Sequence, residues 1–195
     1  MTTDWNEPFA RFAEVFELAK QSQPKDPNAA TLASVDAKGR PSARVVLMKE
    51  FDSRGFVVYT NYESQKGREL IGQKVAALNF YWPSLDRQVR IEGTVEQVTA
   101  AESDEYFASR PRVSQLGAWA STQSQPLDDR KTLEQRVVDF GAKFEGQRVP
   151  RPPHWGGFRI LPERIEFWTG RESRLHDRLV YEKRGSGWVK GALFP

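Results

Sequence analysis

Three arginines and one histidine crowd into eight residues near the end of the chain: Arg171, Arg174, His176 and Arg178. They belong to RIEFWTGRESRLHDRLVY, residues 164–181, in which apolar runs flank the charges on both sides. Surface loops usually spread such charge among small polar residues, and a core position gains little from a histidine flanked by arginines. The stretch is therefore either a solvated strand edge, with Trp168 covering the core, or a segment that binds a ligand.

A second group of residues with chemical potential lies in YTNYESQKGREL, residues 59–70. Thr60 ends an apolar strand, and Ser64, Gln65 and Lys66 begin a helix. Free backbone N–H groups, a hydroxyl and a lysine at a helix N-terminus form a site for phosphate. An ordinary helix cap is the alternative interpretation.

A third group lies in EYFASRPRVSQLGAW, residues 105–119. Tyr106 and Arg110 are four residues apart and share one face of a helix, and Ser114 follows a break marked by proline. A phenol, a guanidinium and a hydroxyl can converge on one anion. The alternative places Tyr106 and Phe107 in the core and Arg110 in solvent.

Two further cations, Arg44 and Lys49, bracket the apolar strand ARVVLMK. Taken alone, they are better explained as two strand-end charges that reach solvent. Together with the preceding groups they indicate two separate anion sites with aromatic residues nearby and no metal ligands.

The composition narrows the class of protein. The chain has 195 residues, which suit one domain, 1–195, with a full core. Cysteine is absent, which excludes disulfides, thiolate metal sites and cysteine nucleophiles, and the two histidines make a histidine-rich metal site unexpected. A net charge of +3 without a basic stripe predicts no nucleic-acid partner. No apolar run approaches the roughly 20 residues of a membrane helix, and no signal peptide is evident, so we expect a cytoplasmic protein.

The elements that must position these residues are mainly strands joined by short turns, with helices inserted between strand pairs. This order favours an antiparallel barrel over a parallel sheet, and neither a GxGxxG nor a GxxxxGK[ST] motif is present. We expect a helical N-terminal segment over about 1–25 and C-terminal strands over about 155–195. The predicted helices cover about 7–21, 64–73, 100–110, 114–120 and 127–144, and the predicted strands cover 29–36, 42–52, 56–61, 75–82, 87–99, 156–168, 178–184 and 188–194.

The segment IEFWTGRESRLHDR, residues 165–178, resembles the signature of the pyridoxamine 5′-phosphate oxidases, flavin enzymes of vitamin B6 metabolism. RVVLMK, VVYTN, RQVRIEG, YFASRPRVSQLGAW, QS and WGGFR occur in the order of that family and extend the resemblance over nearly the whole chain from Asp26 onward. The resemblance implies a mainly β, FMN-binding split β-barrel, antiparallel and Greek-key-like. It also implies a homodimer with two FMN sites at its interface.

The resemblance also implies the reaction: FMN-dependent oxidation of pyridoxamine 5′-phosphate or pyridoxine 5′-phosphate to pyridoxal 5′-phosphate. O₂ is the acceptor, H₂O₂ is released, and ammonia leaves from the amine. By motif, the residues that hold FMN are Arg44, Val45, Val46, Leu47, Met48, Lys49, Tyr59, Thr60, Gln65, Lys66, Gln88, Gln123, Ser124, Trp168 and Arg178. Those that hold the substrate are Lys49, Tyr106, Arg110, Ser114, Arg174, Leu175 and His176, of which Arg174 and His176 are the catalytic pair that covers the substrate ring.

The chain departs from the family pattern in three places. Gln65-Lys66 stands where Arg-Lys is usual, MTTDWNEP replaces an Arg-Arg-rich segment that can cover the site, and KGALFP lacks an arginine shortly before the last proline. Two alternatives follow: a related flavin oxidase acting on another ring, as in phenazine biosynthesis, or a non-catalytic flavin or pyridoxal-phosphate carrier. The presence of Tyr106, Arg110 and Ser114 favours the B6 oxidase.

Overall fold

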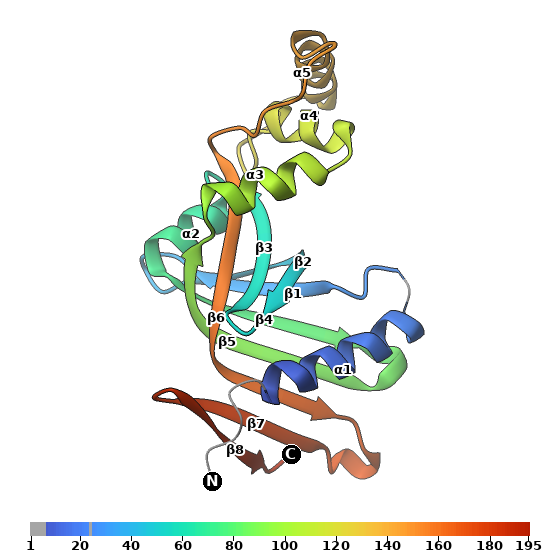
Figure 1. Ribbon diagram of the computed structural model, residues 1–195, viewed down its shortest axis with the longest axis vertical. Helices are drawn as coiled ribbons and strands as arrows, with labels where there is room; N and C mark the ends of the chain where they lie inside the picture. The colour runs from blue at the N-terminus through green and yellow to red at the C-terminus, as the bar shows by residue number, and fades with distance from the viewer. Residues whose placement is uncertain (1–6, 24) are drawn as a thin grey trace.

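The computed structural model describes residues 7–23 and 25–195 (Figure 1). Asn6, a candidate cap for the first helix, and the segment before it lie outside this range. The strands are β1 Ala29–Val35, β2 Pro41–Asp52, β3 Gly55–Asn61, β4 Val75–Trp82, β5 Arg87–Gln97, β6 Trp155–Thr169, β7 Asp177–Arg184 and β8 Gly187–Leu193. The helices are α1 Glu7–Ser22, α2 Gln65–Gln73, α3 Ala100–Ser109, α4 Arg112–Ala120 and α5 Arg130–Lys143, with the short 3₁₀ turns η1 Pro83–Leu85 and η2 Glu172–Arg174.

The strands form one sheet in the order β3-β2-β1-β4-β5-β6-β7-β8, and every neighbouring pair is antiparallel. An additional pairing of β3 with β6 closes β1 to β6 into a barrel of six strands, and β7 and β8 extend the sheet beyond it. The predicted antiparallel barrel is therefore confirmed. Closure is possible because β6 is 15 residues long and pairs with three different strands.

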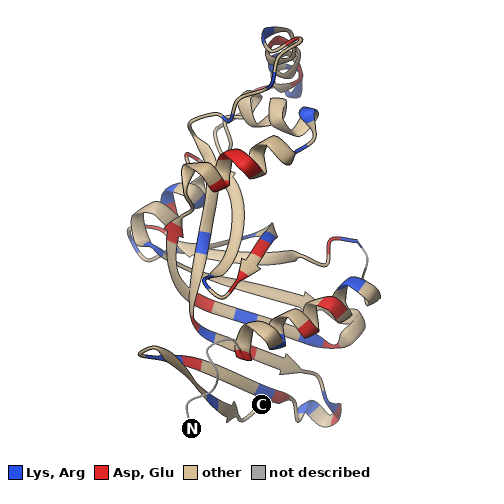
Figure 2. Cartoon of the chain, in the orientation of Figure 1, with Lys and Arg blue, Asp and Glu red and all other residues tan. Residues whose placement is uncertain are grey.

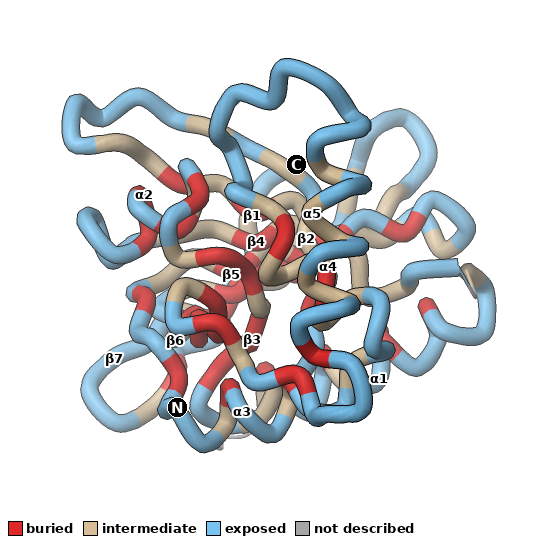
Figure 3. Tube along the Cα trace, turned by 90° about the horizontal axis from the view of Figure 1, so that it is seen from above, coloured by how far each residue is buried: buried red, intermediate tan, exposed pale blue. Residues whose placement is uncertain are grey.

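Helix α1 packs its phenylalanines into the barrel core. Phe12 is fully buried, and its ring packs edge-on against Phe56 and Phe80 at centroid distances of 4.8 and 5.2 Å. Phe9 and Phe16 follow the three- and four-residue steps of one helix face and are also buried. Figure 3 shows the buried segments gathered on the central strands, with exposed loops and helices around them.

Three element boundaries differ by two or more residues from those predicted, each beside a helix cap. Helix α4 begins at Arg112 because Pro111 is its N-cap, and α5 begins at Arg130 because the Asp129 side chain accepts a hydrogen bond from the Lys131 N–H. Strand β5 ends at Gln97, since Thr99 is committed to the capping box of α3. The strand-to-helix order is otherwise as expected.

The long axis of the molecule separates two groups of elements. Helices α3, α4 and α5 lie at one end, η2, β7 and β8 lie toward the other, and β6 runs between them (Figure 1). Lysines and arginines are interspersed with acidic residues along the strands (Figure 2). Within residues 7–23 and 25–195, no helix is long and apolar enough to cross a membrane.

Candidate active site

A cavity of about 820 Å³ opens between the barrel and the helical end of the molecule. Strands β2 and β3, the start of α2, helices α3 and α4 and the first residue of β6 contribute to its wall. The predicted site residues that line it are Val45, Val46, Leu47, Lys49, Tyr59, Thr60, Lys66, Tyr106, Arg110, Ser114 and Gln123. Both predicted anion sites therefore open into one cavity.

The first anion site lies at the start of α2. The buried Ser64 caps this helix, and its Oγ accepts a hydrogen bond from the Gly67 N–H at 3.1 Å. Lys66 Nζ donates to Gln123 Oε1 at 3.0 Å and lies 3.4 Å from Thr60 Oγ1. Burial, together with the positive charge of Arg44, lowers the pKa of Lys66. A phosphate at this helix N-terminus would give Lys66 the negatively charged partner that it lacks among the described residues.

The second anion site is built around Arg110, the C-cap of α3. Its guanidinium lies over the Trp155 ring at 4.7 Å, and Nη1 is buried without a hydrogen-bond partner. Burial lowers the pKa of Arg110. Across the part of the chain that the structure describes, neither Arg110 nor Lys66 forms an ion pair. A half-buried cation with an unused hydrogen-bond donor is suited to bind an anion.

Aromatic rings hold the second anion site in place. The rings of Tyr59 and Tyr106 stack at 4.1 Å, and Tyr59 also stacks on Trp155 at 5.5 Å. Burial and the charge of Glu50 raise the pKa of Tyr59, so its phenol stays neutral and donates a hydrogen bond to that carboxylate at 3.2 Å. Tyr106 packs against a small buried cluster and also lines the cavity, so the core interpretation and the binding interpretation of this residue are both partly right.

The residues predicted to contact the flavin ring and the substrate ring form a separate group on and beside β5, β6 and β7. Gln88 is paired with Trp168, and Trp168 with Arg178, so the three side chains stand in one row on one face of the sheet. The Trp168 and His176 rings are 4.6 Å apart, and His176 Nδ1 accepts a hydrogen bond from the Arg171 N–H at 3.1 Å. None of these side chains lines the cavity.

Arg44 and Arg178, the two arginines predicted to hold FMN, each form an ion pair with a buried carboxylate. Glu69 is 8% exposed, and its Oε2 lies 3.3 Å from Arg44 Nη2. Glu166 is 2% exposed, and its Oε1 accepts a hydrogen bond from Arg178 Nε at 2.8 Å. Neither Glu69 nor Glu166 was predicted as a site residue, because the helix pattern of the one and the strand pattern of the other predict only an outward-facing charge.

Several predicted residues lie apart from the cavity wall. The Gln65 amide donates to Glu69 Oε1 at 2.9 Å, and the Met48 side chain lies in the barrel core at 3% exposure. Ser124 has a φ of 70°, and Leu175 is 69% exposed beside η2. Trp155, which we did not predict as a site residue, lines the cavity below Arg110.

Comparisons with known proteins place this chain in a family. Residues 17–144 match the family described as pyridoxamine 5′-phosphate oxidase. Residues 155–195 match the pyridoxine 5′-phosphate oxidase C-terminal dimerisation region. The chain is 60% identical over 189 residues to a pyridoxine/pyridoxamine 5′-phosphate oxidase of Myxococcus xanthus (strain DK1622), covering 97% of this chain and 92% of that one. It is 59% identical to the corresponding protein of Caulobacter vibrioides (strain NA1000 / CB15N), covering 97% and 85%.

Solved structures agree with the barrel. PhzG from Burkholderia lata 383, in complex with tetrahydrophenazine-1-carboxylic acid, superposes with a TM-score of 0.91 at 31% identity and covers 100% of this chain and 98% of its own. An FMN-binding protein from Nostoc punctiforme PCC 73102, related to pyridoxamine 5′-phosphate oxidases, has the same fold, with a TM-score of 0.76 at 16% identity and coverage of 94% and 97%. The predicted split-barrel fold is confirmed.

Proposed function

Because the chain belongs to the pyridoxamine 5′-phosphate oxidase family and is therefore an oxidoreductase, we propose its cofactor, substrates and products. It oxidises pyridoxamine 5′-phosphate and pyridoxine 5′-phosphate to pyridoxal 5′-phosphate with FMN as cofactor. O₂ is the electron acceptor and becomes H₂O₂, and the amine substrate also releases ammonia. The observation that carries the proposal is a single cavity with two half-buried cations, Lys66 and Arg110, that have no ion-pair partner among the described residues.

Two cation sites match the two phosphates of this reaction, one on FMN and one on the substrate. Lys66, Thr60 and the N-terminus of α2 would hold the FMN phosphate, as helix N-termini do in many phosphate sites. Tyr106, Arg110, Ser114 and Lys49 would hold the substrate phosphate. The residues present therefore fit an FMN-dependent enzyme.

The chain's own residues bind and orient the reactants. When bound, FMN supplies the two-electron chemistry of the reaction. Gln88, Trp168 and Arg178 would hold the flavin ring, and Arg174 and His176 would cover the substrate ring and press it toward the cofactor. Across residues 7–23 and 25–195, no group of three or more His, Asp or Glu side chains is placed to hold a metal ion.

Within one chain, the cavity and the residues around Trp168 lie at opposite ends of β6. The cavity is bounded by Trp155 at the first residue of β6, whereas Trp168 lies 13 residues further along that strand. An extended strand of 13 residues spans at most roughly 40 Å, so the two groups are well separated along β6. We therefore propose that each active site combines the cavity of one protomer with a second group of side chains from its partner. This Trp168 group consists of Gln88, Trp168, His176 and Arg178.

The sheet has a suitable face for such a dimer. Successive register partners in five strands, Val45, Thr31, Asn79, Arg90 and Glu166, present their side chains on the same side. Val45 lines the cavity, and Trp168 follows Glu166 by two residues, so this face carries both halves of the machinery. A two-fold axis near the middle of the row would place each half against the other half of the partner. The match of residues 155–195 to a dimerisation region supports this arrangement.

The second candidate function is the oxidation of an unphosphorylated ring by the same cofactor. It is favoured by the close superposition of PhzG, whose structure contains tetrahydrophenazine-1-carboxylic acid. The two candidates differ in the need for a substrate-phosphate site. Arg110→Ala removes a charge-assisted contact worth about 1.5–3 kcal/mol, so we expect a roughly 10- to 150-fold lower kcat/KM for pyridoxine 5′-phosphate. Pyridoxine itself should start poor and change little, and FMN affinity should hold.

Arg148→Ala is the matched control, since this exposed arginine carries the same charge and lies outside the cavity. Steady-state O₂ consumption with each substrate provides the comparison. If Arg110→Ala oxidises pyridoxine 5′-phosphate as well as Arg148→Ala does, the substrate-phosphate assignment is wrong. A wild-type protein that oxidises only an unphosphorylated ring would favour the second candidate.

A further inference from the structure

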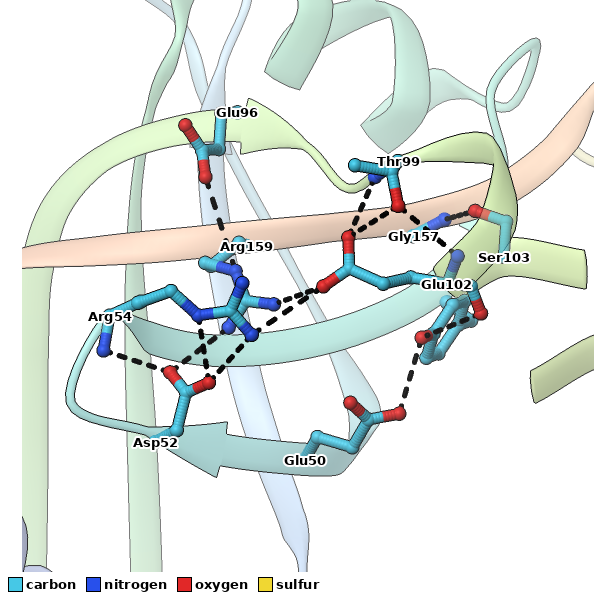
Figure 4. Close-up of polar contacts among 10 residues, drawn as sticks. Glu50, Asp52, Arg54, Glu96, Thr99, Glu102, Ser103, Gly157 and Arg159 are labelled. Carbon is cyan, nitrogen blue, oxygen red and sulfur yellow. Dashed lines mark hydrogen bonds and ion pairs between the residues drawn. The ribbon is translucent and has the colours of Figure 1, made fainter. Parts of the chain in front are cut away.

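Arg159 is a charged side chain in the interior that the proposed reaction does not use. It lies on β6 and is 2% exposed. A charge at such depth is costly unless it is paired. Its Nη2 donates to Glu102 Oε1 at 2.8 Å and its Nη1 to Asp52 Oδ1 at 3.2 Å, while Nε lies 3.9 Å from Glu96 Oε1 (Figure 4). The carboxylates come from three different elements, and Arg159 joins them.

Glu102 connects this cluster to helix α3. One of its oxygens, Oε2, accepts hydrogen bonds from the Thr99 N–H and the Thr99 hydroxyl, both at 2.8 Å, and closes the capping box of the helix. The other oxygen, Oε1, pairs with Arg159. The same carboxylate therefore fixes the first turn of α3 internally and ties it to the barrel (Figure 4).

Helix α3 also carries the substrate-phosphate residues. Tyr106 lies one helical turn after Glu102, and Arg110 ends the helix after another turn. The Tyr59 ring stacks on Tyr106 at 4.1 Å, and its hydroxyl lies 3.5 Å from the Glu102 carbonyl oxygen. Eight residues of helix span roughly 12 Å, so a tilt of about 10° at Glu102 would move Arg110 by roughly 2 Å. Displacements of that size are large for a binding site.

We propose that the Arg159–Glu102 ion pair is a positioning device that sets the orientation of α3 and so places Tyr106 and Arg110 for the substrate phosphate. Glu102 and Arg159 do not line the cavity themselves and act through the helix. The assignment of Tyr106 and Arg110 to the substrate phosphate rests on the proposed function. The anchoring of α3 rests on the contacts alone.

Glu102→Gln tests the device with little change in shape. Glutamine can still accept the capping hydrogen bond from Thr99, but it cannot form the ion pair with Arg159 or the longer one, at 3.6 Å, with the exposed Arg54. Glu96→Gln is the matched control. It also removes one negative charge near Arg159, but Glu96 is on β5, is 56% exposed at its side chain and lies 3.9 Å from the guanidinium. A difference between the two variants therefore reports the tie to α3 rather than the charge of the cluster.

Steady-state kinetics and hydrogen exchange of α3 measure the effect of these substitutions. We expect Glu102→Gln to raise KM for pyridoxine 5′-phosphate roughly 2- to 30-fold, the range of energetic coupling for residues that touch no ligand, with kcat and FMN affinity near wild type. Glu96→Gln should leave KM within about twofold. Hydrogen exchange of the α3 amides should be faster in Glu102→Gln than in Glu96→Gln, and Arg159→Lys, which keeps the charge, should retain part of the protection.

Equal exchange in α3 for Glu102→Gln and Glu96→Gln would overturn the anchoring, whatever the substrate is. Faster α3 exchange with an unchanged KM would overturn the positioning of the phosphate site. A wild-type protein that ignores pyridoxine 5′-phosphate would instead refute the proposed function, and the exchange measurement would still decide the anchoring. An equal loss of kcat and FMN affinity would also contradict the proposal, because a positioning role predicts a selective change in KM.

Discussion

The cations of the site fall into two kinds. Arg44 and Arg178 are paired with the buried carboxylates of Glu69 and Glu166, so they can orient a ligand with little change in net charge. Lys66 and Arg110 lack such partners in the described part of the chain, and burial lowers the pKa of both. An anionic ligand should therefore gain most of its electrostatic attraction from the second kind.

Glu166 should be visible in the acid stability of the protein. Burial acts to raise its pKa, but the hydrogen bond and charge of Arg178, with Arg90 and Arg164, outweigh burial and hold the pKa below the usual 4.5. Its stabilising effect is thus present above that pH and is lost as pH falls through the lower, folded-state pKa. Glu166→Gln should lower the free energy of unfolding at pH 7 by about 1–3 kcal/mol, less than for a fully buried pair because the arginines are partly solvated.

Urea unfolding of both proteins between pH 3 and pH 7 provides the measurement, and the difference between the two curves should shrink toward the acid end. Glu163→Gln, an exposed position on the same strand, serves as the control and should unfold like wild type. Parallel curves over the whole pH range would mean that the ionisation of Glu166 does not contribute to folding.

At the scale of an element, α2 shows how a short helix can present a cation. It has nine residues, with Ser64 as N-cap and Lys74 in the left-handed conformation as C-cap. Its first turn packs closely against the chain that precedes it. A Cβ on Gly67 would overlap the carbonyl oxygens of Asn61 and Tyr62. Lys66 therefore reaches Thr60 and Gln123 only because the next residue has no side chain.

Gly67→Ala should push the start of α2 away from the strand and displace Lys66. We expect a loss of about 1–3 kcal/mol in unfolding free energy and weaker FMN binding by calorimetric titration. Gly72→Ala lies in the same helix, where a new Cβ meets nothing within 4 Å, and should stabilise the protein by about 0.5–1 kcal/mol. If both substitutions behave alike, the close approach of α2 to the preceding residues does not matter for the site.

At the scale of the whole molecule, we propose that the residues at the two ends of β6 serve active sites shared between two chains. Arg110 belongs to the cavity, and His176 belongs to the group around Trp168. If each active site takes one half from each protomer, a change in Arg110 and a change in His176 on different chains fall into the same site of a heterodimer. The other site of that dimer is then intact.

Heterodimers of an Arg110→Ala chain and a His176→Ala chain, purified through different tags, should therefore recover about half of wild-type activity. The two parent homodimers should remain strongly impaired, and light scattering should report dimers in all three preparations. Heterodimers no more active than their parents would show that Arg110 and His176 of the same chain serve the same site. A monomeric active protein would exclude the shared site altogether.

Much of the architecture follows from local patterns in the sequence. The turn residues of the first hairpin, the cap at Ser64 and the capping box at Thr99 specify their elements through neighbouring residues, and the structure has all three. The motif resemblance, carried by residues 165–178 and six further segments, is confirmed by the family match. Lys66, Tyr106 and Arg110, which their motifs assigned to two separate anion sites, line one cavity in the structure.

Only the tertiary structure decided which charges are compensated and where each candidate site residue lies. Arg159 meets Asp52 across 107 positions of the chain, and Thr60 meets Gln123 across 63. Such pairs form because β3 closes against β6 and the helices fold over that seam, and no local periodicity encodes them. A carboxylate at an outward position of a strand looks the same in the sequence whether it faces water or three arginines, as Glu166 does. Its environment depends on the register of the neighbouring strands, which the barrel sets as a whole.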